Sequence, residues 1–164
     1  MSIRKRRMIV TVLAGLSLVA GTALATPGVG VIGAPVHARG TNAELLNIHS
    51  DAGIKLKTKK PLDLVTQQIT IAPGGTTGWH SHPGPVLVTI KSGALTVVYA
   101  SDPSCGGRTY SAGQSFVDRG DEDVHTALNL GTTPVEFWAT YLVPGAPGSA
   151  FRLDSPDPGC DFWR

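Results

Sequence analysis

Three histidines lie in two short segments of the chain whose patterns suit a metal site. His80 and His82 are separated by one residue in the segment GWHSHPG, and His125 follows in VHTALN. Side chains two apart on an extended strand point to the same face, so His80 and His82 are expected to share a face. Three imidazoles would be costly to bury without a use, and neutral imidazole is the commonest metal ligand. The histidines therefore predict a divalent transition metal with open coordination positions.

The elements that must position these histidines are predicted as short β-strands. Strands joined by turn signals about every ten residues indicate an all-β sandwich or barrel, and no stretch after residue 40 keeps a helical period. On the strand 86–91, the alternating residues Val86, Val88 and Ile90 are expected to face the interior. The expected strands are 54–57, 64–73, 86–91, 94–100, 108–110, 114–117, 124–130 and 135–143.

Two longer segments resemble the two motifs of the cupin superfamily. The first is HSHPGPVLVTIKSG and the second is GQSFVDRGDEDVHTALN. In the first motif Gly75, His80, His82 and Gly93 correspond; in the second, Gly113, residues 118–120, His125 and Asn129 correspond. The second motif is one residue longer than the family's pattern, and Asp118 stands where proline is expected. The resemblance covers residues 64–143 and implies a small antiparallel jelly-roll barrel.

Val86 is the main departure from the family's pattern. It lies four residues after His82, where the family has a glutamate that joins three histidines in holding iron, manganese, nickel or zinc. Valine has no lone pair, so two interpretations stay open. Either three histidines hold the metal, which resembles the thiol dioxygenases of the superfamily, or the barrel has lost strong metal binding and holds a small molecule. The acidic residues 121–123 are expected to form a solvated loop at the barrel mouth.

The composition favours one compact domain of strands and turns. The chain has 164 residues, with 20 glycines and 12 prolines, which is enough for one core. Four of its fourteen basic residues lie at positions 4–7, which leaves ten basic against twelve acidic residues elsewhere. No basic patch remains for nucleic acid, so a nucleic-acid partner is not expected.

The first 25 residues have the three parts of a secretory signal. A basic start, an apolar middle and an Ala-Leu-Ala close predict export, so that the protein is secreted or associated with the cell envelope. The alternative is an uncleaved anchor, in which case this segment alone contacts a membrane. Residues 26–42 are small and glycine-rich and predict a flexible linker. Residues 43–164 are then the cupin β-barrel.

Cys105 and Cys160 are the two cysteines of the chain. In an exported protein such a pair is most simply a disulfide, which here would pin the C-terminal tail to the barrel. A thiolate ligand or a catalytic cysteine is the alternative. Both cysteines lie in turns rich in glycine and proline, which favours the disulfide.

These features together predict an exported single-domain cupin that binds iron, manganese, nickel or zinc through His80, His82 and His125. The predicted chemistry is dioxygenase-like and acts on a small organic molecule. No other cofactor is expected, and the sequence identifies no catalytic residue beyond the metal ligands. The alternative is a non-catalytic exported protein, small-molecule-binding or structural, with a degenerate metal site. The resemblance also implies pairing of two copies as a homodimer.

Overall fold

The computed structural model describes residues 25–160 of the chain. Residues 1–24, on which almost all of the predicted signal segment falls, lie outside the described residues, as do residues 161–164. Within residues 25–160 there is no helix long and apolar enough to cross a membrane.

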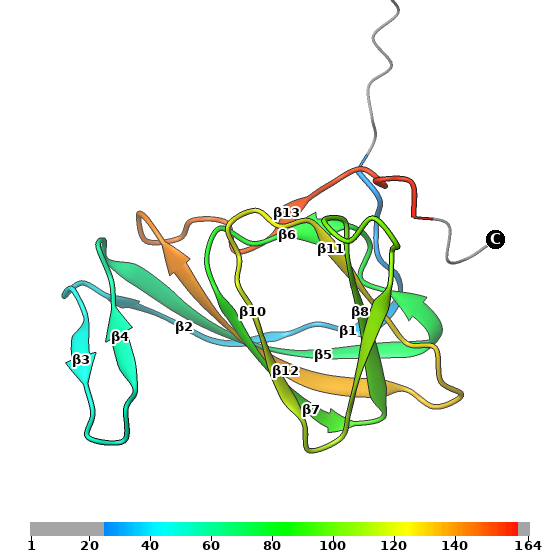
Figure 1. The fold of residues 1–164 in the computed structure, drawn as a ribbon, viewed down its shortest axis with the longest axis horizontal. Helices are drawn as coiled ribbons and strands as arrows, with labels where there is room; N and C mark the ends of the chain where they lie inside the picture. The colour runs from blue at the N-terminus through cyan, green and yellow to red at the C-terminus, as the bar shows by residue number, and fades with distance from the viewer. Residues whose placement is uncertain (1–24, 161–164) are drawn as a thin grey trace, which may run out of the picture.

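The described chain forms a nearly closed antiparallel β-barrel, which confirms the predicted all-β cupin fold (Figure 1). The strand β5 (Leu62–Thr76) belongs to both sides of the barrel, because it pairs with β12 along one side and meets β11 at Thr76 on the other. The first side contains β10 (Ser115–Asp118), β7 (Val86–Ser92), β12 (Val135–Pro144) and β5. The second side contains β9 (Gly107–Ser111), β8 (Ala94–Tyr99), β11 (His125–Leu128), β6 (His80–Ser81) and β13 (Leu153–Asp154).

The strand β7 shows why the sequence pattern predicted a barrel. Val86, Val88 and Ile90 are buried, as predicted, while the residues between them are exposed. Each fully buried aliphatic side chain contributes about 1.5–3 kcal/mol relative to leaving it in water. The same alternation along β12 buries Phe137 and Tyr141 on the inner face. The inner faces of these neighbouring strands form the apolar wall of the barrel.

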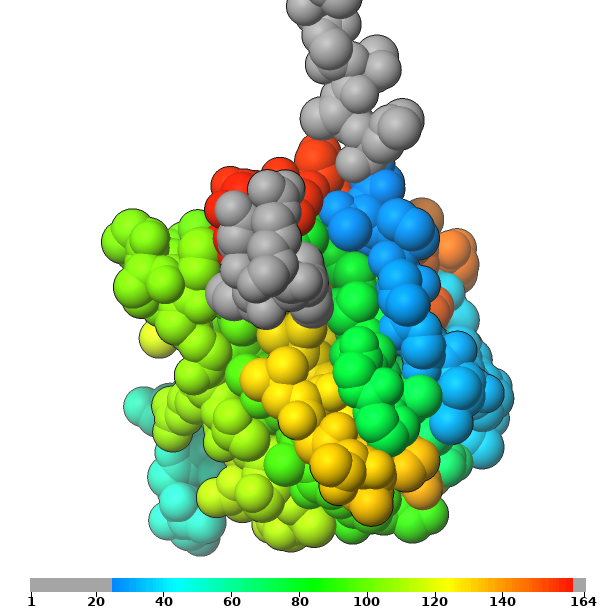
Figure 2. All heavy atoms as spheres, turned by 90° about the vertical axis from the view of Figure 1, so that its right-hand side faces the viewer, coloured from blue at the N-terminus to red at the C-terminus, as the bar shows by residue number. Residues whose placement is uncertain are grey.

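Residues 26–42 differ from the predicted flexible linker. They contain β1 (Val29–Gly33) and β2 (Val36–Asn42), which pair antiparallel with β5. In Figure 2 this blue segment lies along the side of the molecule against the green end of β5. Nearly all side chains of the two strands are exposed, so no apolar alternation marks them in the sequence. Backbone pairing holds them instead, together with an ion pair in which Arg39 donates to the buried Asp63 at 2.7 Å.

A separate hairpin changes the predicted domain boundary. The strands β3 (Asn47–His49) and β4 (Lys55–Lys57) pair only with each other and project from the barrel (Figure 1). All of their side chains are exposed. The predicted strand at 54–57 therefore exists, but it lies outside the barrel, and the barrel sheet begins at β1 rather than at residue 43.

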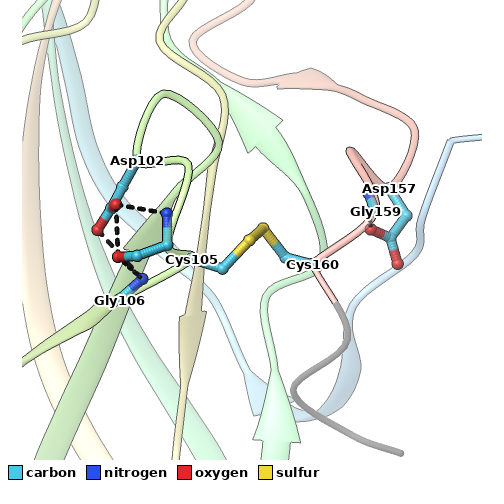
Figure 3. The surroundings of a disulfide bond; sticks show 7 residues. Asp102, Cys105, Gly106, Asp157, Gly159 and Cys160 are labelled. Atoms are coloured by element: carbon cyan, nitrogen blue, oxygen red, sulfur yellow. Dashed lines mark hydrogen bonds between the residues drawn. A yellow bond between two sulfur atoms is a disulfide. The ribbon is translucent and has the colours of Figure 1, made fainter.

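Cys105 and Cys160 form the predicted disulfide, with 5.8 Å between their Cα atoms (Figure 3). The carboxylate of Asp102 accepts hydrogen bonds from the backbone N–H groups of Ser104 and Gly106, which shapes the loop around Cys105. Cys160 is buried among the apolar side chains of a small second core that contains Trp79 and Leu128. The disulfide thus joins the C-terminal segment to the β8–β9 loop.

Replacing both cysteines in C105S/C160S should destabilise the protein. The bond closes a loop with a sequence separation of 55 residues, for which chain entropy predicts a loss of up to about 4 kcal/mol. Urea unfolding of the oxidised protein and of the variant measures this difference. Equal free energies of unfolding would contradict the structural role of the bond.

Candidate metal centre

The three predicted histidines meet inside the barrel. His80 lies on β6 and pairs directly with His125 on β11, while His82 follows β6 at the turn into β7. Each ring is about 5% exposed. The ring centroids lie 4.5 Å apart for His80 and His125, 4.9 Å for His80 and His82, and 5.1 Å for His82 and His125. One nitrogen of each ring lies within 4.8 Å of the corresponding nitrogens of the other two, so the three side chains could hold one metal ion.

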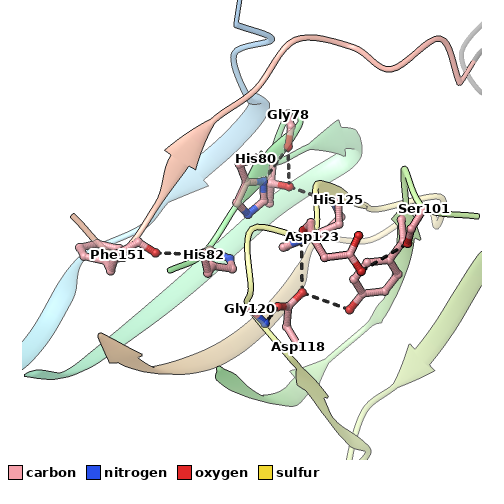
Figure 4. A network of polar contacts seen from close by, with 12 residues as sticks. Gly78, His80, His82, Ser101, Asp118, Gly120, Asp123, His125 and Phe151 are labelled. Carbon is pink, nitrogen blue, oxygen red and sulfur yellow. Dashed lines mark hydrogen bonds and ion pairs between the residues drawn. The ribbon is translucent and has the colours of Figure 1, made fainter. Parts of the chain in front are cut away.

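A backbone carbonyl fixes the orientation of each ring (Figure 4). The Nδ1 atoms lie at 2.8 Å from Gly78 O for His80, 2.7 Å from Phe151 O for His82 and 3.0 Å from Asp123 O for His125. A carbonyl oxygen only accepts hydrogen bonds, so each Nδ1 must carry the proton. The lone pair is then on Nε2, which is the atom left for a metal. Three histidines that offer such lone pairs in one buried place could hold a metal ion.

Burial keeps His80 and His82 uncharged. It lowers the pKa of His80 well below its ordinary value, and the electrostatic effects of the neighbouring His125 and Arg152 lower it further. Burial also lowers the pKa of His82 to about 4, against an opposing effect of the hydrogen bond to Phe151. Since only the neutral ring has a free lone pair, both side chains are ready to bind a metal at neutral pH.

Asp118 is a site residue that sequence reasoning missed. It is 2% exposed and lies at the end of β10, with Oδ2 at 3.2 Å from Nδ1 of His125. The same carboxylate accepts hydrogen bonds from the hydroxyl of Tyr99 at 3.1 Å and from the N–H of Gly120 at 2.7 Å (Figure 4). One signal was present in the sequence. Asp118 lies two residues after Phe116 on the same strand, so an inward-facing acid could have been expected there.

The loop of residues 121–123 brings the chain from Asp118 back to His125. Asp121 and Glu122 are exposed, in agreement with the expected solvated loop, and both have positive φ angles of 55° and 60°. The backbone carbonyl of Asp123 serves the site, while its carboxylate accepts a hydrogen bond from Ser101 at 3.3 Å. The loop therefore contributes a carbonyl to the histidine cluster, and its acidic side chains point elsewhere.

A cavity of about 630 Å³ adjoins the histidines. Its size is in the range of small-molecule sites, about 300–1,000 Å³. Charged side chains, among them Arg39 and Arg152, also line it, and the Tyr141 hydroxyl in its wall donates to Oε1 of Gln67 at 2.8 Å. Most of its lining is aliphatic or aromatic and includes Val86, Val88, Leu95, Phe116, Phe137 and Phe151. The barrel thus offers a mainly apolar chamber with the three imidazoles in its wall.

Comparisons with known proteins find a matching family and several similar solved structures. The family described as Cupin domain matches residues 67–143, which include all three histidines. Similar solved structures include a protein of Klebsiella pneumoniae with a double-stranded β-helix domain, which is 22% identical, with 66% of this chain and 90% of that chain covered and a TM-score of 0.46. A cupin domain of Bordetella pertussis is 20% identical, with 73% of this chain and 97% of that chain covered and a TM-score of 0.45. Another is the oxalate decarboxylase of Bacillus subtilis, which has Mn(II) centres. It is 20% identical, with 57% of this chain and 23% of that chain covered and a TM-score of 0.44. No curated protein matches the sequence.

The metal-free protein should lose stability as the pH falls from about 6.5 to about 4.5. An unfolded histidine takes up a proton near pH 6.5, whereas folded His82 does so only near pH 4 and His80 also well below 6.5. The unfolded state therefore binds more protons in this window, and acid favours unfolding. Urea unfolding at several pH values measures the slope. His82→Gln should make the slope shallower and His37→Gln, at an exposed position, should not; a flat profile for the unmodified protein would contradict burial of neutral rings.

Proposed function

This chain belongs to the cupin superfamily, and from that premise we propose that it binds one divalent transition metal through His80, His82 and His125. The observation that carries the proposal is the set of three Nδ1–carbonyl hydrogen bonds, which leaves three Nε2 lone pairs together in a buried place. A core that only needed to be filled would not require three imidazoles whose ring nitrogens lie within 4.8 Å of one another.

The donor set also bears on which metal the site takes. Val86 supplies no carboxylate, so the ligands from the chain are three neutral imidazoles. Imidazole suits iron, nickel and zinc, whereas manganese prefers oxygen donors. We therefore place iron, nickel and zinc ahead of manganese for this protein.

The proposed activity is dioxygenase-like oxidation of a small organic molecule. A bound iron ion would supply redox and Lewis-acid chemistry at the coordination positions that the chain leaves open. The residues around those positions hold the imidazoles in one orientation and surround them with many apolar side chains. Among the described residues of the cavity wall, we identify no general base, because the charged side chains have partners. Arg39 pairs with Asp63, Arg152 with Asp154, and Asp118 contacts His125.

The cavity indicates an apolar ligand. Four aromatic rings, of Phe116, Phe137, Tyr141 and Phe151, line the chamber together with aliphatic side chains such as Val86 and Leu95. Aromatic pairs favour offset or edge-to-face contacts, which a planar ligand can extend. We propose a mainly apolar, partly aromatic molecule with one oxygen or nitrogen donor directed to the metal.

Val86 also supports a second candidate function. An aliphatic side chain where the superfamily has a metal-binding carboxylate also suits a non-catalytic exported protein whose barrel holds an apolar molecule. Export is part of both proposals. The disulfide supports it, since such bonds persist in oxidising compartments outside the cytosol.

The metal content of the purified protein separates these two functions. We expect close to one transition-metal ion per chain when the protein is prepared without chelators and its metals are measured by mass spectrometry. The variant H80A/H82A/H125A should contain none, because its imidazole ligands are removed. The matched control H37A/H49A changes two exposed histidines outside the cluster and should keep the metal. A folded protein that takes up none of the added metals would favour the non-catalytic function.

Binding of an apolar fluorescent probe tests the ligand class. An anilinonaphthalene probe should bind saturably, and V88F should weaken this binding by tenfold or more because Val88 lines the cavity. The control is L87F, since Leu87 lies on the same strand but points outward and is 49% exposed. Equal effects of the two variants on probe fluorescence would count against the chamber as the ligand site.

A further inference from the structure

We propose that Asp118 supplies, from the neighbouring strand, the negative charge that Val86 no longer provides. In this role it is a positioning residue, which acts on the metal through the ring of His125. The inference rests on the proposed function, since it assigns a further residue to the same metal site.

The strand register places the two positions side by side. Asp118 on β10 pairs directly with Val86 on β7. Directly opposed residues of an antiparallel pair point to the same face, with their Cβ atoms about 4.5–5.5 Å apart. Both residues are 2% exposed, and both line the cavity. An acid at either position therefore reaches the same part of the barrel interior.

The contacts of Asp118 indicate that it acts through His125. Its Oδ2 atom lies at 3.2 Å from Nδ1 of His125, which is the protonated side of the ring and not the side with the lone pair. Among the described residues, no lysine or arginine forms an ion pair with Asp118, and its charged oxygen faces the ring of His125. The carboxylate charge is therefore directed at the histidine cluster instead of being neutralised by a permanent cation.

The surroundings of Asp118 hold the carboxylate in place. Tyr99 donates to Oδ2 and Gly120 donates to Oδ1, so both oxygens have partners despite the burial. Gly120 has a φ of +73°, and a Cβ at this position would come within 2.4 Å of the carbonyl of Gly84. Because Gly84 follows His82 by two residues, this close approach packs the Asp118 turn against the His82 turn.

A carboxylate bonded to the Nδ1–H of a metal ligand has a defined physical effect. It orients the ring, stabilises the Nδ1–H tautomer and makes Nε2 a stronger electron donor. It also places a negative charge near the bound cation without occupying a coordination position. The chain would thus supply three ligands, one fewer than with a glutamate at position 86, and would leave one more coordination position for a bound molecule.

Cobalt(II) binding to four forms of the full protein tests this inference. Cobalt affinity is measured by competition with a chelator, and the visible absorption of the bound ion reports the ligand field. D118N should weaken cobalt binding by roughly 10- to 100-fold, which is the range seen when such outer partners are removed. V86E should tighten binding, and V86E/D118N should return to within a few fold of the unmodified protein, because the charge is restored from the opposite strand.

Two further variants separate the charge from the fold. D121N is the matched control, because it removes an exposed carboxylate from the same loop without a contact to the histidine cluster, and it should bind cobalt normally. Y99F removes only the hydroxyl that holds Asp118 and should weaken cobalt binding by a few fold, which tests the role even if D118N does not fold.

The possible outcomes distinguish this inference from the proposed function. Cobalt affinity and spectrum unchanged in both D118N and Y99F would overturn the inference while the metal site stands. A loss in D118N that V86E does not repair, although V86E tightens binding in the unmodified background, would overturn it as well. If neither the unmodified protein nor V86E binds cobalt, the proposed function fails and the inference fails with it.

Discussion

The structure of the site depends on one constraint, which is that the Nδ1 atom of every histidine in the cluster is bonded to a backbone carbonyl. For His80 and His125 the carbonyl belongs to the residue two positions earlier, so local chain geometry is enough. For His82 the carbonyl belongs to Phe151, which is 69 residues away. The C-terminal segment is therefore part of the site, held there by β13, which pairs with β6, and by the disulfide.

This constraint explains how a mostly apolar barrel tolerates three imidazoles. A buried polar group is costly unless it is hydrogen-bonded, and here each ring has one nitrogen satisfied by the backbone. The second nitrogen is left for a ligand, and burial keeps His80 and His82 neutral. The absence of a carboxylate at Val86 is consistent with this constraint. Val86 adds an aliphatic side chain to the cavity wall, and Asp118 on the neighbouring strand provides the negative charge.

The barrel could be predicted from the sequence because its strands bury one face, as the alternation of Val86, Val88 and Ile90 shows. The cluster of three histidines could also be predicted, from the spacing of His80 and His82 and from the resemblance of the two motifs to the cupin superfamily. The strands β1 and β2 escaped prediction because backbone pairing holds them and their side chains stay exposed. The contributions of Asp118 and Phe151 escaped it because they arise from strand register and from a distant carbonyl, which no local pattern records.

The most direct test is the tautomer of each histidine in the metal-free protein, measured by long-range proton–nitrogen NMR correlation at neutral pH. The two ring nitrogens give distinct nitrogen shifts according to which of them carries the proton. We predict that Nδ1 carries a proton in His80, His82 and His125 alike, and that the rings of His80 and His82 are neutral. A proton on Nε2 of any of the three, or a charged ring at His80 or His82, would contradict the account, because the lone pairs would no longer meet at one point.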